Sequence, residues 1–156
     1  MAELPREIRG LMIPVANGRL LLPNATVAEV VTYTAPERQD NAPDWLLGMV
    51  TWRGWRLPLF SFSRIAGIGH EDNFSNTKIA VLKALGGDPK LPFMAVLTQG
   101  FPRLATVTPE SLVPTDDDDG HRATGVLAEV LVRDDPAIIP DLARIEAMVL
   151  AALSPA

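Results

Sequence analysis

The chain has 156 residues, of which 47% are hydrophobic and 21% are charged, and its formal charge at pH 7 is −5. This length and balance are typical of one globular domain with a substantial core. The negative charge argues against a nucleic-acid partner, because binding to a phosphate backbone normally depends on a basic surface. The lack of cysteine excludes disulfides and thiolate metal sites, and it fits a reducing compartment.

The sequence also bears on where the protein acts. No uninterrupted apolar run approaches the roughly 20 residues that a membrane span requires. Residues 1–7 have none of the basic, apolar and small-residue regions of a secretion signal. We therefore expect a cytoplasmic protein.

The predicted fold begins with a β-hairpin and a third strand. Residues 11–15 and 19–22 are rich in apolar side chains and flank Asn17-Gly18, which is the strongest short-range hairpin signal in the sequence. Residues 27–31 show the two-residue period of a strand. One face of this strand is predicted to carry Val27, Glu29 and Val31.

Residues 47–60 predict a second hairpin and are the most informative segment. Two apolar runs flank Gly54, which can supply the positive φ of a tight turn. If Arg53-Gly54 is a two-residue turn, Trp52 and Trp55 lie opposite each other as a cross-strand pair. Arg is unfavourable at the first position of such a turn, so a three-residue loop ending in Gly54, with its register shifted by one, is the alternative. Each tryptophan is either a core side chain or part of a binding surface.

Beyond this hairpin the sequence predicts a short helical turn over residues 61–66, a second β set and a terminal helix. The apolar period changes to 3.6 from Asp141, which predicts a helix over residues 141–153 with Asp141 as its N-cap. About nine or ten strands in all predict small barrels or a sandwich. The strands of the second set are residues 79–82, 92–97, 104–107, 125–132 and 137–139.

The chain carries two β sets of similar size. They cover residues 10–66 and 77–139, and each could form one barrel. We expect both to belong to one domain that spans residues 1–156, with the helix at the end.

The hairpin of residues 47–60 resembles the signature hairpin of CheW-like domains, which are scaffold modules of bacterial chemosensory arrays. Gly48 precedes the apolar strand, Arg53-Gly54 form the turn, and Pro58 lies in the returning apolar strand. Weaker matches in the same order are residues 27–31, 42–48 and 101–114. The resemblance covers about residues 10–153. It implies a mainly β fold of two intertwined SH3-like five-stranded barrels with a C-terminal α-helix.

The resemblance also implies a function. It predicts a non-catalytic adaptor that couples chemoreceptors to a CheA-type histidine kinase, in chemotaxis or in type IV pilus motility. The implied partners are the cytoplasmic tip of a chemoreceptor and the regulatory domain of the kinase. No cofactor, nucleic acid or membrane insertion is implied, although the adaptor could be recruited to membrane-anchored receptor arrays.

The resemblance places Arg53 and Glu29 near the receptor-binding surface, with Val27 and Gly54 shaping it. Trp55 joins this predicted site because a tryptophan beside an arginine is the composition of an interface hot spot. Without the resemblance, Arg53 would be a solvated turn residue and Glu29 a charge on a strand surface.

Three residues depart from the family pattern. The signature commonly has Asn where Thr51 stands, a small or aliphatic residue where Trp55 stands, and Asp where Ser61 stands. The fold should tolerate these changes. They bear instead on which partner the protein binds.

Catalytic and metal sites have little support. The sequence has only His70 and His121, and it lacks a Gly-rich phosphate loop, a nucleophile elbow and a metal-binding His pair. The acidic run Asp116 to Asp119 could offer oxygen ligands to Ca²⁺, but it lacks the spacing and closing Glu of a twelve-residue calcium loop. A solvated charge run is the simpler interpretation. The alternative function is a β-barrel small-ligand binder or a metal-dependent hydrolase that uses these aspartates.

Overall fold

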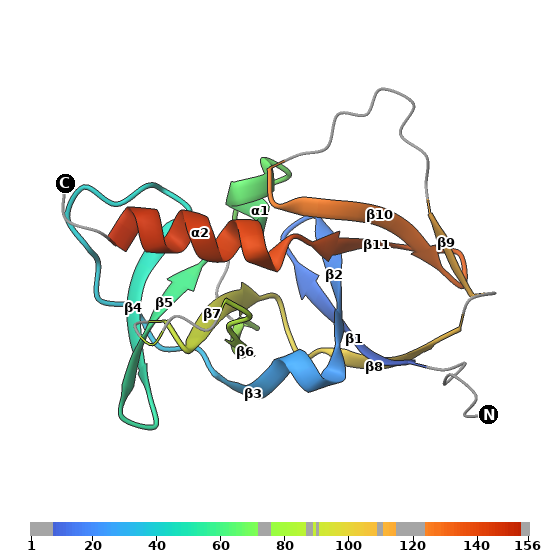
Figure 1. The fold of residues 1–156 in the computed structure, drawn as a ribbon, viewed down its shortest axis with the longest axis horizontal. Coiled ribbons are helices and arrows are strands. Elements are labelled where there is room, and N and C mark those ends of the chain that lie inside the picture. The colour runs from blue at the N-terminus through green and yellow to red at the C-terminus, as the bar shows by residue number, and fades with distance from the viewer. Residues whose placement is uncertain are drawn as a thin grey trace.

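The computed structural model describes residues 8–71, 76–86, 89, 91–108, 111–114 and 124–153. Within these residues the chain forms two β-sheets, one of six strands and one of five. Figure 1 shows the six-stranded sheet on the right, the five-stranded sheet on the left, and the last helix running from the first sheet towards the second. The prediction of a mainly β fold with a C-terminal helix is confirmed.

The six-stranded sheet has the strand order β8-β1-β2-β11-β10-β9. The hairpin predicted around Asn17 is confirmed, because β1 and β2 pair antiparallel and Asn17 lies in the turn with φ of 63°. Strand β9 was not among the predicted strands. The strands are β1 (Ile8–Val15), β2 (Gly18–Pro23), β8 (Arg103–Val107), β9 (Leu112–Pro114), β10 (Val126–Val132) and β11 (Asp135–Pro140).

The five-stranded sheet has the order β3-β6-β7-β5-β4. A 3-10 turn, η1 (Asn24–Thr26), leads from β2 into β3, and the short helix α1 (Phe62–Ala66) follows β5. Strands β5 and β7 are parallel, whereas the other neighbours are antiparallel. The strands are β3 (Val27–Thr32), β4 (Leu46–Trp52), β5 (Trp55–Phe60), β6 (Lys78–Lys83) and β7 (Phe93–Thr98).

The sheets do not follow the expected division of the chain into residues 10–66 and 77–139. Strands β1 and β2 pair with β8 and β11, while β3, β4 and β5 share a sheet with β6 and β7. Each sheet therefore takes strands from both halves of the sequence, as intertwined barrels require. Hydrophobic periodicity identifies a strand but not its neighbour, because pairing depends on contacts between distant segments.

The predicted face of β3 is wrong in one respect. Val27 packs against one hydrophobic cluster, whereas Ala28 and Val31 pack against another, so Val27 and Val31 do not share a face. The cause is a β-bulge: the pairing of β3 with β6 shifts register between Val27 and Glu29. An extra residue at a bulge reverses the faces of the residues that precede it.

A central core joins the two sheets. Strands β1 and β2 supply Ile13 and Leu20 from one sheet, and Ala80 and Met94 come from β6 and β7 of the other. Alternate residues of these strands point the opposite way, as Ile79 and Val81 do into the second core, inside the five-stranded barrel. A third core fills the six-stranded barrel. The strands shared between cores are apolar on both faces, and so their sequences are nearly continuous apolar runs.

Helix α2 (Leu142–Leu153) covers the central core. Its buried apolar residues Leu142, Ile145 and Val149 belong to that core, as the 3.6-residue period of the sequence predicts. Asp141 is the predicted N-cap, and its side chain accepts a hydrogen bond of 3.1 Å from the Arg144 amide. Within the described residues, the helices are all too short or too polar to span a membrane.

A buried carboxylate fixes α2 to the β6–β7 connection. Glu146 is 4% exposed, and its oxygens accept hydrogen bonds of 3.0 Å from the Leu85 and Gly86 amides. Two amides that follow the end of β6 are thereby satisfied by a side chain on the last helix. A Cβ at Gly86 would lie 2.4 Å from Glu146 Oε1, so the close approach depends on glycine.

We expect Glu146→Gln to lower the free energy of unfolding by about 1–3 kcal/mol, because an amide group would then face backbone N–H donors that need an acceptor. Chemical denaturation measures this change. Ala147→Gln is the matched control, since Ala147 is the next residue on the same helix and is exposed. Equal denaturation midpoints for the two variants would mean that the Glu146 carboxylate contributes nothing to stability.

Candidate partner-binding site

The β4–β5 turn is a two-residue turn. Trp52 and Trp55 are register partners, and the two residues between them have positive φ, 48° at Arg53 and 81° at Gly54. Positive φ at both central positions defines the type I′ turn of tight hairpins. The alternative three-residue loop is therefore wrong. The left-handed conformation of Arg53 costs roughly 1 kcal/mol, so an arginine here is tolerated rather than favoured by the backbone.

A second glycine supports the hairpin from its outer edge. The backbone groups of Glu37 and Met49 exchange two hydrogen bonds of 2.8 Å, so the loop before β4 covers part of that edge strand. Gly48 has φ of 144°, and a Cβ there would lie 2.3 Å from the Glu37 carbonyl oxygen. The glycine that precedes the signature strand is required because another backbone passes beside it.

Glu29 reaches the hairpin from the opposite edge of the five-stranded sheet. Strands β3 and β4 are the two edges of this sheet, and they are not hydrogen-bonded to each other. Glu29 Oε1 nevertheless accepts hydrogen bonds of 3.0 Å from both Trp52 Nε1 and Arg53 Nη2. The sheet is therefore curled into a barrel, and these side chains bridge the seam between its edges.

Aromatic rings surround this ion pair. The Trp52 ring meets Phe93 edge to face with centroids 5.0 Å apart, and Trp55 lies 6.2 Å from the same ring. The Arg53 guanidinium lies 5.1 Å from the centre of the Trp52 ring, within the range of a cation–π contact. Trp55 is 47% exposed, whereas Trp52 is half-buried against the second core. The tryptophans therefore differ, one supporting the barrel and the other facing solvent.

Four of the five predicted site residues come together at this end of the barrel: Arg53, Gly54, Glu29 and Trp55. Val27 does not join them, because the bulge turns it towards the central core. Sequence reasoning missed the roles of Trp52 and Phe93. For Trp52 the available signal was its indole, which lies next to the turn arginine in the sequence. For Phe93 there was no local signal, because it comes from the distant strand β7.

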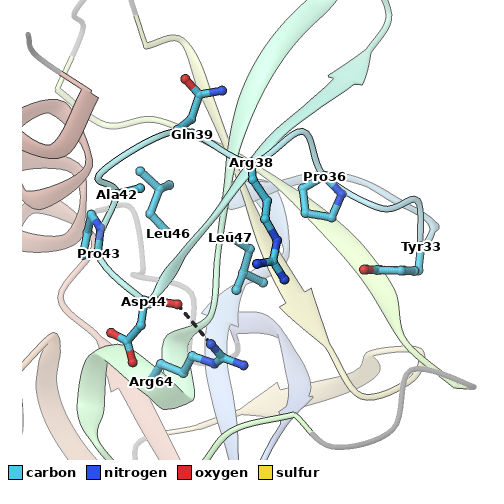
Figure 2. Close-up of a pocket in the computed structure, with 10 residues that line it drawn as sticks. All are labelled: Tyr33, Pro36, Arg38, Gln39, Ala42, Pro43, Asp44, Leu46, Leu47 and Arg64. Atoms are coloured by element: carbon cyan, nitrogen blue, oxygen red, sulfur yellow. Dashed lines mark hydrogen bonds between the residues drawn. The ribbon is translucent and has the colours of Figure 1, made fainter.

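A separate surface pocket of about 320 Å³ lies beside the loop between β3 and β4. Figure 2 shows Arg38 and Arg64 extending into one side of it, with Arg64 Nη1 donating to the Asp44 carbonyl oxygen at 3.2 Å. Arg64 Nε lies 3.6 Å from the buried Glu71 carboxylate, so the Arg64 guanidinium already forms an ion pair within the protein. The lining residues are Tyr33, Pro36, Arg38, Gln39, Ala42, Pro43, Asp44, Leu46, Leu47 and Arg64.

The alternative of a metal-dependent hydrolase gains no support from the described residues. Among the described residues, no group of three or more His, Cys, Asp or Glu side chains is placed to hold a metal ion. The acidic run at Asp116 to Asp119 and His121 lie outside the described residues.

The curled sheets, the type I′ hairpin and the last helix define a fold of two small β-barrels with a C-terminal helix. The family model of the CheW-like domain matches residues 9–148, and the chain belongs to this family. The solved structure of the scaffolding protein TtCheW from Thermoanaerobacter tengcongensis is similar in fold, with a TM-score of 0.73 and 17% identity, over 91% of this chain and 89% of that chain. No curated protein matches the sequence. The expected pair of SH3-like barrels is confirmed, with a sixth strand in one sheet.

Ser61, one of the departures from the family pattern, has a structural explanation. Its hydroxyl accepts a hydrogen bond of 3.3 Å from the Arg64 amide as the N-cap of α1. The same hydroxyl donates to Glu71, whose oxygens lie 2.8 and 3.0 Å away. The Glu71 side chain is 1% exposed. An aspartate at position 61 would also cap the helix, but it would bring a second carboxylate against Glu71.

We therefore expect Ser61→Asp to lower the free energy of unfolding by about 3 kcal/mol, the scale of a buried charge without a compensating partner. Ser61→Asn is the matched control, since it keeps the cap and the size without the charge. Thermal or denaturant unfolding checks both variants. The double variant Ser61→Asp, Glu71→Gln should recover most of the loss; continued instability would show that charge repulsion is not the cause.

Proposed function

We propose that this protein is a non-catalytic adaptor that couples chemoreceptors to a CheA-type histidine kinase. The observation that carries the proposal is the match to the CheW-like domain over residues 9–148, which includes the Arg53-Gly54 hairpin. The implied partners are the cytoplasmic tip of a receptor and the regulatory domain of the kinase. The output is either chemotaxis or type IV pilus motility, and the adaptor would act in the cytoplasm at membrane-anchored receptor arrays.

The proposed contact surface consists of Arg53, Gly54, Glu29, Val27 and Trp55. Its support is the exposure of charged and aromatic groups at one end of the barrel: the side chains of Arg53 and Glu29 are 69% and 38% exposed. An exposed ion pair of this kind contributes less than about 1 kcal/mol to stability, so recognition is the better reason for the arrangement. Val27, half-buried, would act only by shaping the backbone that presents Glu29.

An adaptor of this kind works through proximity and differential binding. By binding receptor and kinase together, it raises the effective concentration of each at the other. It transmits a signal only if its contacts differ in free energy between the active and inactive arrangements of its partners. The rigid barrels would hold the two partners in register, while one interface changes with the state of the receptor.

Reconstitution tests this function. We expect purified kinase to autophosphorylate at the same rate with or without the adaptor, and to respond to receptor only when the adaptor is present, because the protein supplies proximity and no chemistry. The readout is transfer of labelled phosphate with cognate receptor, kinase and adaptor at fixed concentrations. If receptor and kinase couple equally well without this protein, the adaptor hypothesis fails.

Arg53→Glu should weaken binding to the receptor tip or the kinase domain by roughly tenfold or more, the scale of one charge-assisted contact. Stability should change by less than about 1 kcal/mol, because the residue is exposed. Titration calorimetry and thermal melting measure the two effects. Arg56→Glu is the control, since Arg56 is an exposed hairpin arginine that also pairs with a glutamate at 3.0 Å. Similar losses of affinity in both variants would point to general electrostatics.

A further inference from the structure

Trp52 holds the Glu29 carboxylate in place. Its indole N–H donates to Glu29 Oε1 over 3.0 Å in a partly buried hydrogen bond. The ring is itself held edge to face against Phe93, with centroids 5.0 Å apart. An indole has one donor and no acceptor, so its orientation selects a single oxygen of the carboxylate. Trp52 belongs to the hairpin and Glu29 to the far edge strand, so this bond fixes Glu29 relative to the turn.

The two donors converge on one oxygen. Arg53 Nη2 donates to the same Glu29 Oε1, also over 3.0 Å, and among the described residues none donates to Oε2. A carboxylate oxygen accepts about two hydrogen bonds. Glu29 Oε1 is therefore saturated, while Oε2 belongs to a side chain that is 38% exposed.

We propose that Trp52 is a positioning residue that presents Glu29 Oε2 to a lysine ammonium of the protein partner. This inference rests on the proposed function, because it assumes that the hairpin end of the barrel contacts a partner. A lysine fits better than an arginine because a guanidinium fork pairs with both carboxylate oxygens, and here Oε1 is already occupied. An ammonium is a compact charge that needs only one open oxygen.

Positioning has a measurable consequence for affinity. A glutamate that is held before binding loses less side-chain freedom when the partner arrives. Trp52→Phe removes the N–H donor and keeps an aromatic ring against Phe93. We expect it to weaken partner binding roughly tenfold, which corresponds to one hydrogen bond to a charged group. Trp45→Phe is the control, because it removes an indole that packs against the central core, away from the hairpin turn.

A double-mutant cycle separates positioning from packing. If Trp52 acts through Glu29, Trp52→Phe should have no further effect on affinity in a Glu29→Ala background. The probes are an isolated receptor tip and an isolated kinase regulatory domain, each titrated into the full chain. Acetylation of the probe's lysines should also remove the affinity difference between wild type and Glu29→Ala. A nitrogen-15 NMR spectrum should show the Trp52 indole signal shifted in Glu29→Ala and the Trp45 signal unchanged.

The outcomes distinguish this inference from the proposed function. If wild-type protein binds neither probe, the proposed function and the positioning role both fail. If wild type binds a probe and Trp52→Phe binds it equally well, only the positioning role is overturned. The same holds if Trp52→Phe costs as much affinity in the Glu29→Ala background as in wild type. If the affinity difference between wild type and Glu29→Ala remains after the probe's lysines are acetylated, the assignment of a lysine as the partner's charged group is overturned.

Discussion

The packing of two sheets on one central core is the constraint on which the rest of the structure depends. Strands β1, β2, β6 and β7 each send alternate side chains into this core and into a barrel of their own, so they have no face left for solvent. Burial on both sides fixes the register of these strands, because a slip of one residue would exchange the two cores. The outer strands β3 and β4 are then left as edges, and the site forms where those edges approach each other.

The polar groups that support the fold differ from those of the candidate site. The buried Glu71 carboxylate accepts hydrogen bonds from the Ser61 hydroxyl and lies 3.6 Å from Arg64 Nε, and the buried Glu146 carboxylate accepts from two backbone amides. Each carboxylate ties a connection to a helix. Such groups are costly to leave unpaired, so they specify geometry. The Glu29–Arg53 pair is exposed and contributes little to folding. The hydrogen-bond partners of Glu29 and Arg53 can therefore change without loss of the fold.

Local features of the fold were predictable from sequence, and distant contacts were not. The turns at Asn17 and Gly54 and the cap at Asp141 depend on a few adjacent residues whose chemistry is visible in the chain. The assignment of strands to barrels failed because it depends on pairing across long separations. The bulge that turns Val27 away from Glu29 has no local signature. The family resemblance predicted Glu29 and Arg53 as site residues, but only the curled sheet shows that Trp52 contacts Glu29 as well.

The seam between β3 and β4 has a mechanical consequence. Elsewhere in the five-stranded sheet, neighbouring strands are joined by backbone hydrogen bonds, which are extensive between β3 and β6, β6 and β7, and β4 and β5 and short between β5 and β7. Near the hairpin tip the barrel is closed by side chains that meet at one oxygen atom. A load applied at the tip would open that contact without breaking a ladder. At that point the edge strands can separate without loss of a backbone hydrogen bond, because only side chains join them.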